Sequence, residues 1–172
     1  RDEETARIAV TASITGHLVV STLHTNSAAA SITRLADMGI EPYLIADATV
    51  GVIAQRLVRR LCECKRSRTA TPEEMAALGC KPDTPPITIY DPGRCTICND
   101  TGYSGRIGVY EIMPITGRVK HAISKKTTSE EIQKIALEDG MSTLRMSAAR
   151  LVREGITTIA EMKRITYSEE DE

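Results

Sequence analysis

The chain has 172 residues, of which 41 % are hydrophobic and 26 % charged, a composition that suits one globular domain or one domain with a small insert. Lys and Arg number 22 and Asp and Glu 23, so the net charge of −1 gives no reason to expect a nucleic-acid partner. The chain has no Trp or Phe, so it lacks most of the aromatic rings on which bases stack. No apolar run approaches the roughly 20 residues that cross a bilayer. Composition and charge therefore argue against a disordered chain, a nucleic-acid-binding protein and a transmembrane segment.

The first part of the chain alternates helical and strand-like patterns. Asp2 is expected to cap a helix that ends near Gly16 and is apolar on nearly every side, which predicts a buried helix. Residues 17–23 form a short apolar run rich in β-branched side chains, typical of a central parallel strand. A second helix, capped by Asn26 or Ser27, is predicted to run through Met38, and a third is predicted over residues 42–54. This alternation indicates an α/β fold.

The middle of the chain predicts a β-hairpin with an expanded tip. Residues 56–61 and 106–112 are expected to be strands, and residues 62–105 between them are polar, rich in Pro and Gly, and carry all five cysteines. We expect a small metal-binding module there. The sequence thus divides into an α/β part (1–61), a cysteine-rich insertion (62–105) and a returning strand with a helical subdomain (106–172).

The last part of the chain is predicted to be a small helical bundle. Two possible capping boxes, Thr128-x-x-Glu131 and Thr158-x-x-Glu161, mark helix starts. Residues 168–172 form an acidic tail beyond the last helix. Nothing in these helices indicates chemistry.

Four of the five cysteines form two close pairs with the spacing of a metal site. Cys95 and Cys98 are a C-x-x-C pair, which lets two thiolates face one tetrahedral zinc, and Cys62 and Cys64 are a shorter C-x-C pair. We predict a structural Zn²⁺ bound by these four residues. The alternatives are a site that has lost its metal, a redox role for the cysteines, and a site in which Cys80 replaces Cys64.

A second candidate site follows the predicted strand of residues 17–23. In open parallel sheets, ligands bind beyond the carboxyl ends of the strands, where Thr22 and His24 are expected. The His24 ring can donate a hydrogen bond to a phosphate oxygen, and Thr22 can help to hold a phosphate or a water molecule. A structural role for this histidine is the alternative.

Four stretches follow one another along the chain and together match one protein family. They are Arg1-Asp2-x-Glu4-Thr5-Ala6 with Thr15-Gly16-His17-Leu18-Val19-Val20-Ser21-Thr22-Leu23-His24-Thr25-Asn26, Ala54-Gln55-Arg56-Leu57-Val58-Arg59-Arg60-Leu61-Cys62, Gly102-Tyr103-Ser104-Gly105-Arg106-Ile107-Gly108-Val109-Tyr110-Glu111, and Gly155-Ile156-Thr157-Thr158-Ile159. The chain resembles the type II secretion and type IV pilus assembly ATPases over essentially its whole length. The related retraction ATPases lack the cysteine module, so its presence favours the assembly and secretion branch.

The resemblance implies the carboxyl-terminal part of a RecA-like P-loop ATPase domain, beginning just after the Walker B glutamate. The first residue is Arg1 rather than Met, which agrees with that expectation. By position, Arg1, Asp2 and His24 would be catalytic, with His24 near the γ-phosphate, and Thr22 and His24 would contact the nucleotide. Cys62, Cys64, Cys95 and Cys98 match the family's four zinc ligands, although the family usually has C-x-x-C in the first pair.

The resemblance also implies a setting for the parent protein. It would be a homo-hexamer that uses ATP and Mg²⁺, lies in the cytoplasm at the inner membrane, and works with an inner-membrane platform protein and other secretion or pilus components. No G-x-x-x-x-G-K-[ST] loop occurs in the 172 residues, so we expect no ATP hydrolysis by this chain alone. The alternative from a different class is a free-standing zinc-ribbon interaction module without nucleotide chemistry.

Overall fold

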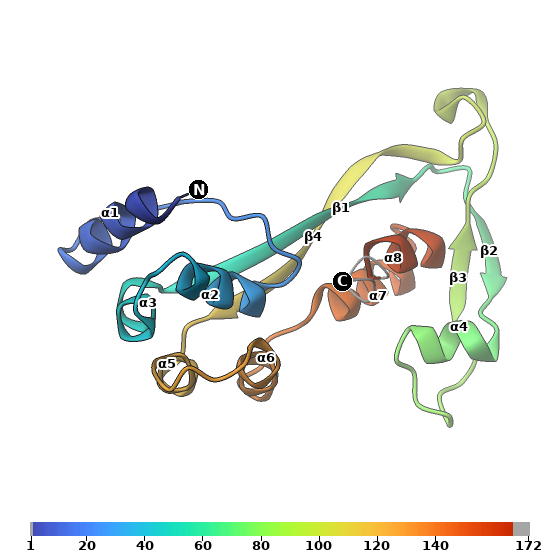
Figure 1. Cartoon of the computed structure of the whole chain (residues 1–172). Coiled ribbons are helices and arrows are strands. Elements are labelled where there is room, and N and C mark those ends of the chain that lie inside the picture. The colour runs from blue at the N-terminus through green and yellow to red at the C-terminus, as the bar shows by residue number, and fades with distance from the viewer. Residues whose placement is uncertain (1, 167–172) are drawn as a thin grey trace. The chain divides into compact units, whose positions relative to one another are not determined.

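A computed structural model describes residues 2–166 of the chain (Figure 1). In chain order its elements are α1 (Glu3–Ile14), α2 (Ala28–Asp37), α3 (Pro42–Ala48), β1 (Gly51–Leu61), β2 (Arg66–Thr69), α4 (Pro72–Ala77), β3 (Thr88–Asp91), the 3₁₀ turn η1 (Thr96–Cys98), β4 (Tyr103–Pro114), α5 (Gly117–Ser124), α6 (Ser129–Glu138), α7 (Leu144–Arg153) and α8 (Ile159–Thr166). No helix among the described residues is long and apolar enough to cross a bilayer.

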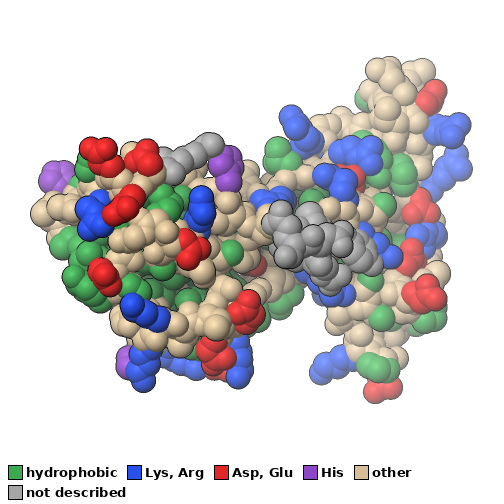
Figure 2. Space-filling model, viewed as in Figure 1, with side chains coloured by type: hydrophobic (Ala, Val, Ile, Leu, Met, Phe, Trp, Pro, Cys, Tyr) green, Lys and Arg blue, Asp and Glu red, His purple; other side chains and the backbone are tan. Residues whose placement is uncertain are grey.

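The chain divides into two compact units. The first unit contains the described residues up to Ala54 together with Glu111–Ser142, and the second contains Gln55–Tyr110 and the described residues from Thr143 onward. The helices α5 and α6 therefore belong to the first unit, and α7 and α8 to the second. On the face seen in Figure 2, acidic, basic and hydrophobic side chains are present on both units.

The helix α1 begins as predicted but is not buried. The Asp2 side chain accepts a hydrogen bond from the backbone N–H of Thr5 at 2.8 Å, which caps the helix. No residue of α1 is buried, and the Ile8 side chain is 64 % exposed. The prediction of burial was wrong because the described part of the chain covers α1 on one side only, where the Ser13 hydroxyl donates to the carbonyl of Ala48.

The predicted central strand over residues 17–23 does not form. The segment has no regular secondary structure, and the Leu18 and Val20 side chains are 87 % and 86 % exposed. A strand needs a neighbour whose backbone takes up its N–H and C=O groups. The strands of the described residues pair only as β1 with β4 and β2 with β3. Residues 17–23 are apolar, as a buried strand would be, but the described residues provide no partner strand for them.

The third predicted helix ends earlier than expected. α3 ends at Ala48, and β1 begins at Gly51 rather than at Arg56. The β-branched residues around Val52 fit an extended backbone better than a helix. β1 pairs with β4, which extends beyond its predicted range at both ends (Figure 1). The hairpin with an expanded tip is thus confirmed, with longer strands.

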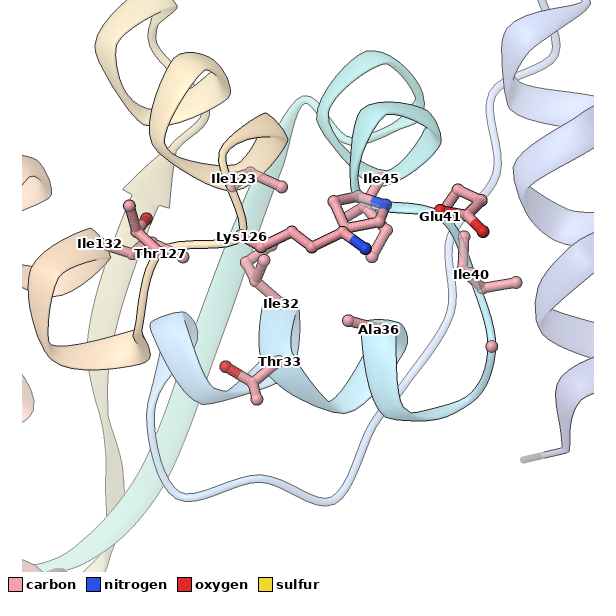
Figure 3. Close-up of a pocket in the computed structure, with 12 residues that line it drawn as sticks. Ile32, Thr33, Ala36, Ile40, Glu41, Ile45, Ile123, Lys126, Thr127 and Ile132 are labelled. Atoms are coloured by element: carbon pink, nitrogen blue, oxygen red, sulfur yellow. The ribbon is translucent and has the colours of Figure 1, made fainter.

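Helices form most of the first unit's core. α3 packs against α5, and α2 packs against α6. Ile32, Ile45, Ile123 and Ile132 line a cavity of about 290 Å³ among them, and the Lys126 side chain extends toward the start of α3 (Figure 3). None of the predicted site residues lines this cavity.

In the second unit, the helices α7 and α8 pack against each other, and α8 is hydrogen-bonded to β1. The Glu161 carboxylate on α8 is 1 % exposed and accepts hydrogen bonds from the backbone N–H of Arg59 at 2.7 Å and from its Nε at 3.0 Å. Arg164 donates to the same carboxylate from its own helix. Thr158 caps α8 by accepting the backbone N–H of Glu161. The Glu161 carboxylate accepts hydrogen bonds from Arg59 and Arg164 in place of the backbone N–H of Thr158 that a capping box requires.

Candidate metal centre and the His24 segment

The four cysteines predicted to bind metal lie together in the second unit. All four sulfur atoms are within 4.8 Å of one another. The Sγ–Sγ distances are 3.8 Å for Cys62 and Cys95, 3.8 Å for Cys64 and Cys98, and 3.6 Å for Cys95 and Cys98. All four are free thiols rather than disulfides.

These spacings fit a tetrahedral metal ion. In a tetrahedron with metal–sulfur bonds of ~2.3 Å, neighbouring sulfur atoms lie ~3.8 Å apart. The three distances are close to that edge length, and all four sulfur atoms lie within 4.8 Å of one another, so the group could hold one ion. Four protein ligands complete a tetrahedron and leave no position for a reacting water molecule. The donor set therefore fits a structural zinc and not a catalytic one.

The first cysteine pair is delivered by the end of β1. Cys62 directly follows the strand, and its backbone N–H donates to the carbonyl of Gly102 at 2.9 Å. The N–H of Lys65 returns to the carbonyl of Cys62 at 3.0 Å, which closes a tight turn around Cys64. This turn brings both thiols of the short C-x-C pair to the site, although one residue of the usual spacing is missing.

The second pair lies on a knuckle around η1. Asn99 and Asp100 follow η1 with left-handed backbone conformations, φ 49° and 59°, and reverse the chain. The backbone N–H of Gly102 then donates to Sγ of Cys98 at 3.2 Å. Such N–H groups stabilise a thiolate, the form in which cysteine binds metal.

Gly93 allows the two halves of the site to approach. A Cβ at this position would lie 1.8 Å from the carbonyl oxygen of Cys64 and 3.2 Å from its sulfur atom. Only glycine fits here without displacing the Cys64 backbone.

The pKa values of Cys64 and Cys98 are shifted in opposite directions. Burial raises the pKa of Cys64 to about 12, and hydrogen bonds with the neighbouring thiols act in the same direction. Burial also raises the pKa of Cys98, but hydrogen bonds, first of all the one from Gly102, outweigh it and lower the pKa to about 6. Metal binding must therefore displace a proton from Cys64 at neutral pH.

Cys80 does not belong to the cluster. Among the described residues, the group that can hold a metal consists of Cys62, Cys64, Cys95 and Cys98. The alternative in which Cys80 takes the place of Cys64 is therefore not the arrangement in this structure.

The module is fastened to the turn between α7 and α8. Nζ of Lys65 donates to the carbonyl of Gly155 at 2.7 Å and lies 4.7 Å from the centre of the Tyr90 ring. The N–H of Leu61 donates to the carbonyl of Ile156 at 2.8 Å. The residues next to Cys62 and Cys64 are thereby held against a packed pair of helices.

The second candidate site lies in the first unit, and its predicted side chains are exposed to solvent. Thr22 and His24 are exposed, in the segment without regular structure that precedes α2. The segment is linked to α2 through Thr25, whose hydroxyl lies 2.7 Å from that of Ser31. Among the other predicted catalytic residues, Asp2 caps α1, and Arg1 lies outside the described residues.

A buried glutamate next to this segment received no role from the sequence. Glu111 on β4 is 1 % exposed, and its carboxylate accepts a hydrogen bond from the N–H of Ala28, the first residue of α2, at 2.8 Å. It is the last residue of the Gly102–Glu111 motif. The sequence signal that could have drawn attention to it is a charged residue within a predicted strand. Its partner is 83 positions away in the chain, so no local pattern could identify it.

Comparisons with known proteins agree on one family. The family model described as "Type II/IV secretion system protein" matches residues 1–164. The chain is 47 % identical over 170 residues to type II secretion system protein E of Pseudomonas aeruginosa, covering 98 % of this chain and 34 % of that protein. It is 44 % identical over 164 residues to the type IV pilus assembly ATPase PilB of Thermus thermophilus, covering 94 % of this chain and 18 % of that protein.

Two solved structures are similar in fold. One is a crystal structure of the pilus retraction motor PilT with bound ADP, with a TM-score of 0.63 and 21 % identity, covering 96 % of this chain and 37 % of that one. The other is the ATPase DotB of Yersinia pseudotuberculosis, with a TM-score of 0.64 and 18 % identity, covering 97 % and 35 %. They confirm the predicted fold class. The chain spans 34 % of the length of the first curated relative and 18 % of the second.

Proposed function

The chain belongs to the family of type II/IV secretion system proteins, and we propose that it is the carboxyl-terminal part of a motor ATPase that assembles pilin-like subunits for secretion or pilus extension. The observation that carries the proposal is the alignment of 98 % of the chain with a type II secretion protein at 47 % identity. The cysteine cluster supports the assembly and secretion branch.

In this proposal, the nucleotide site includes the segment before α2. ATP with Mg²⁺ supplies the phosphoryl group that is transferred to water. His24 would donate a hydrogen bond to the γ-phosphate, and Thr22 would help to hold a phosphate oxygen or a water molecule. Arg1 and Asp2 would directly follow the Walker B glutamate in the sequence. The exposure of Thr22 and His24 supports these roles, because both side chains are accessible to a ligand.

The zinc in this proposal is structural. Cys62, Cys64, Cys95 and Cys98 hold it as thiolates, and it stabilises the insertion of residues 62–105 between the α/β part (1–61) and the carboxyl-terminal part (106–172). The insertion has few buried apolar side chains; they are Cys62, Ala70, Leu78, Ile89 and Cys98. So small a core is usually supplemented by a metal or by disulfides.

The proposed parent protein is a homo-hexamer in the cytoplasm at the inner membrane. It acts there with a platform protein and the other components of the secretion or pilus system. The names of the relatives, which belong to type II secretion and type IV pilus assembly, support this setting. This chain alone, without a P-loop in its 172 residues, is proposed not to hydrolyse ATP.

The test is ATP hydrolysis by the full-length protein that carries this chain, with this chain alone as a second sample. We expect turnover by the full-length protein, a fall of ~100-fold or more in His24→Ala, and no effect of the control His17→Ala. We expect no turnover by the isolated chain. A full-length protein without turnover would contradict the proposal and favour the zinc-ribbon interaction module. Turnover that is unchanged in His24→Ala would contradict the role proposed for His24.

Elemental analysis of the chain, purified without added metal, tests the second part. We expect one zinc ion per chain and four thiols protected from alkylation, with Cys80 reactive. Protein with no metal and five reactive thiols would show that the short C-x-C pair does not support a site.

A further inference from the structure

We propose that Glu111 is a positioning residue that holds the amino end of α2, and with it His24, in place for the reaction. The inference rests on the proposed function, because it concerns the histidine that faces the nucleotide there. Glu111 lies on β4, far from His24 in the chain, and no role follows from its place in the sequence.

The Glu111 carboxylate is built into the first unit as a helix cap. One of its oxygens accepts the N–H of Ala28 at 2.8 Å, while the side chain is 1 % exposed. The first N–H groups of a helix have no partner within the helix and carry partial positive charge, so they are a natural partner for a buried carboxylate. A hydrogen bond of this kind is charge-assisted and therefore stronger than one between neutral groups.

The start of α2 is in turn tied to the segment that carries His24. Ser27 caps the helix by accepting the N–H of Ala30 at 3.2 Å. The Thr25 and Ser31 hydroxyls lie 2.7 Å apart and link the residue after His24 to the first turn of the helix. Contacts thus run from Glu111 through the first turn of α2 to Thr25, directly beside His24.

This arrangement gives His24 a fixed carboxyl-terminal neighbour. Residues 17–24 have no regular structure, so the backbone on the other side of His24 provides no comparable restraint. A misplacement of about 1 Å in a group that contacts the reacting atoms costs up to ~100-fold in rate. Loosening the first turn of α2 is therefore expected to slow turnover without removing any group that touches ATP.

The test compares Glu111→Ala and Glu111→Gln in the full-length protein. Glu111→Ala removes the acceptor, whereas Glu111→Gln keeps an oxygen that can accept the Ala28 N–H. We expect Glu111→Ala to lower kcat ~10- to 100-fold with KM for ATP changed less than about threefold, and Glu111→Gln to restore most of the loss. Amide exchange at residues 28–31 is expected to rise at least ~10-fold in Glu111→Ala.

Glu161→Ala is the matched control, because Glu161 is equally buried but caps no residue near His24. We expect it to lower the unfolding midpoint while kcat and the exchange at residues 28–31 stay unchanged. Unchanged kcat in a folded Glu111→Ala protein, or equal losses in Glu111→Ala and Glu111→Gln at unchanged exchange, would overturn the inference. If Glu111→Ala does not fold, Glu111→Gln with altered exchange but normal kcat overturns it as well.

The two proposals fail differently. If the full-length protein has no turnover, the proposed function fails, and this inference fails with it. If turnover is present but unchanged in His24→Ala, the role proposed for His24 fails, and so does this inference. If His24→Ala abolishes turnover while both Glu111 variants are normal, only the positioning role is wrong.

Discussion

Replacing Gly93 by alanine tests the geometry of the metal centre most directly. The new Cβ would lie 1.8 Å from the carbonyl oxygen of Cys64 and 2.6 Å from its carbonyl carbon. Real Cβ atoms essentially never come closer than 3.0 Å to other atoms. The backbones of residues 93 and 64 must therefore separate by at least 1.2 Å, the difference between 3.0 Å and the 1.8 Å to the carbonyl oxygen. The obstacle is backbone, which cannot rotate away as a flexible side chain could.

That displacement is large for a metal site. Metal–ligand distances are held to within about 0.2 Å, and Sγ of Cys64 lies only 3.2 Å from the added carbon. We expect Gly93→Ala to weaken zinc binding by ~10- to 100-fold or more, which corresponds to about 1–3 kcal/mol of overpacking. The measurement is a competition titration with a chromophoric chelator, supported by the thiolate-to-metal absorbance of the cobalt-substituted protein.

The control is Gly117→Ala. Gly117 is the first residue of α5, and no atom lies within 4 Å of a Cβ built there. Because alanine also favours a helix, we expect this variant to bind zinc normally and to be at least as stable as the parent chain. If Gly93→Ala binds zinc with the parent's affinity and keeps the absorbance of four thiolates, the described approach of Gly93 to Cys64 is wrong.

Three further predictions concern titration and capping. Apparent zinc affinity should increase as pH rises through the neutral range, by up to ~10-fold per pH unit for each proton released, because the raised pKa of Cys64 leaves its thiol protonated; chelator competition at several pH values measures this. Glu161→Gln should cost about 2–4 kcal/mol in urea unfolding at neutral pH, because Arg59 and Arg164 lose a charged acceptor. Burial raises the pKa of Glu161, but hydrogen bonds from Arg164 and Arg59 outweigh it and lower the pKa below its ordinary value of 4.5. The ionised carboxylate therefore stabilises the fold above pH 4.5, and this stabilisation is lost as the pH falls through the lowered pKa. The difference in unfolding free energy between the parent and Glu161→Gln should shrink in acid. Ser27→Ala should cost about 1 kcal/mol in the same assay, and an equal midpoint for both proteins would show that the cap of α2 contributes nothing.

Local patterns determined the elements whose causes are local. Asp2 caps α1 as expected, and Ser27 rather than Asn26 caps α2, since a side-chain oxygen that accepts an N–H three residues later acts within one turn. Cys95 and Cys98 lie together because a C-x-x-C turn places two sulfur atoms side by side whatever the rest of the fold. The pairing of β1 with β4 likewise follows from two strand-like runs on either side of one insertion.

Only the tertiary structure decided the features that depend on distant partners. Residues 17–23 have the composition of a buried strand, but composition supplies neither a neighbouring strand nor cover for Leu18 and Val20. The hydrogen-bond partners of Glu111 and Glu161 lie 83 and 102 positions away in the chain. The local sequence around a glutamate in a strand or a helix does not predict such a distant partner. Burial makes these two carboxylates matter, because away from water each must find donors, and the fold alone determines which donors are near.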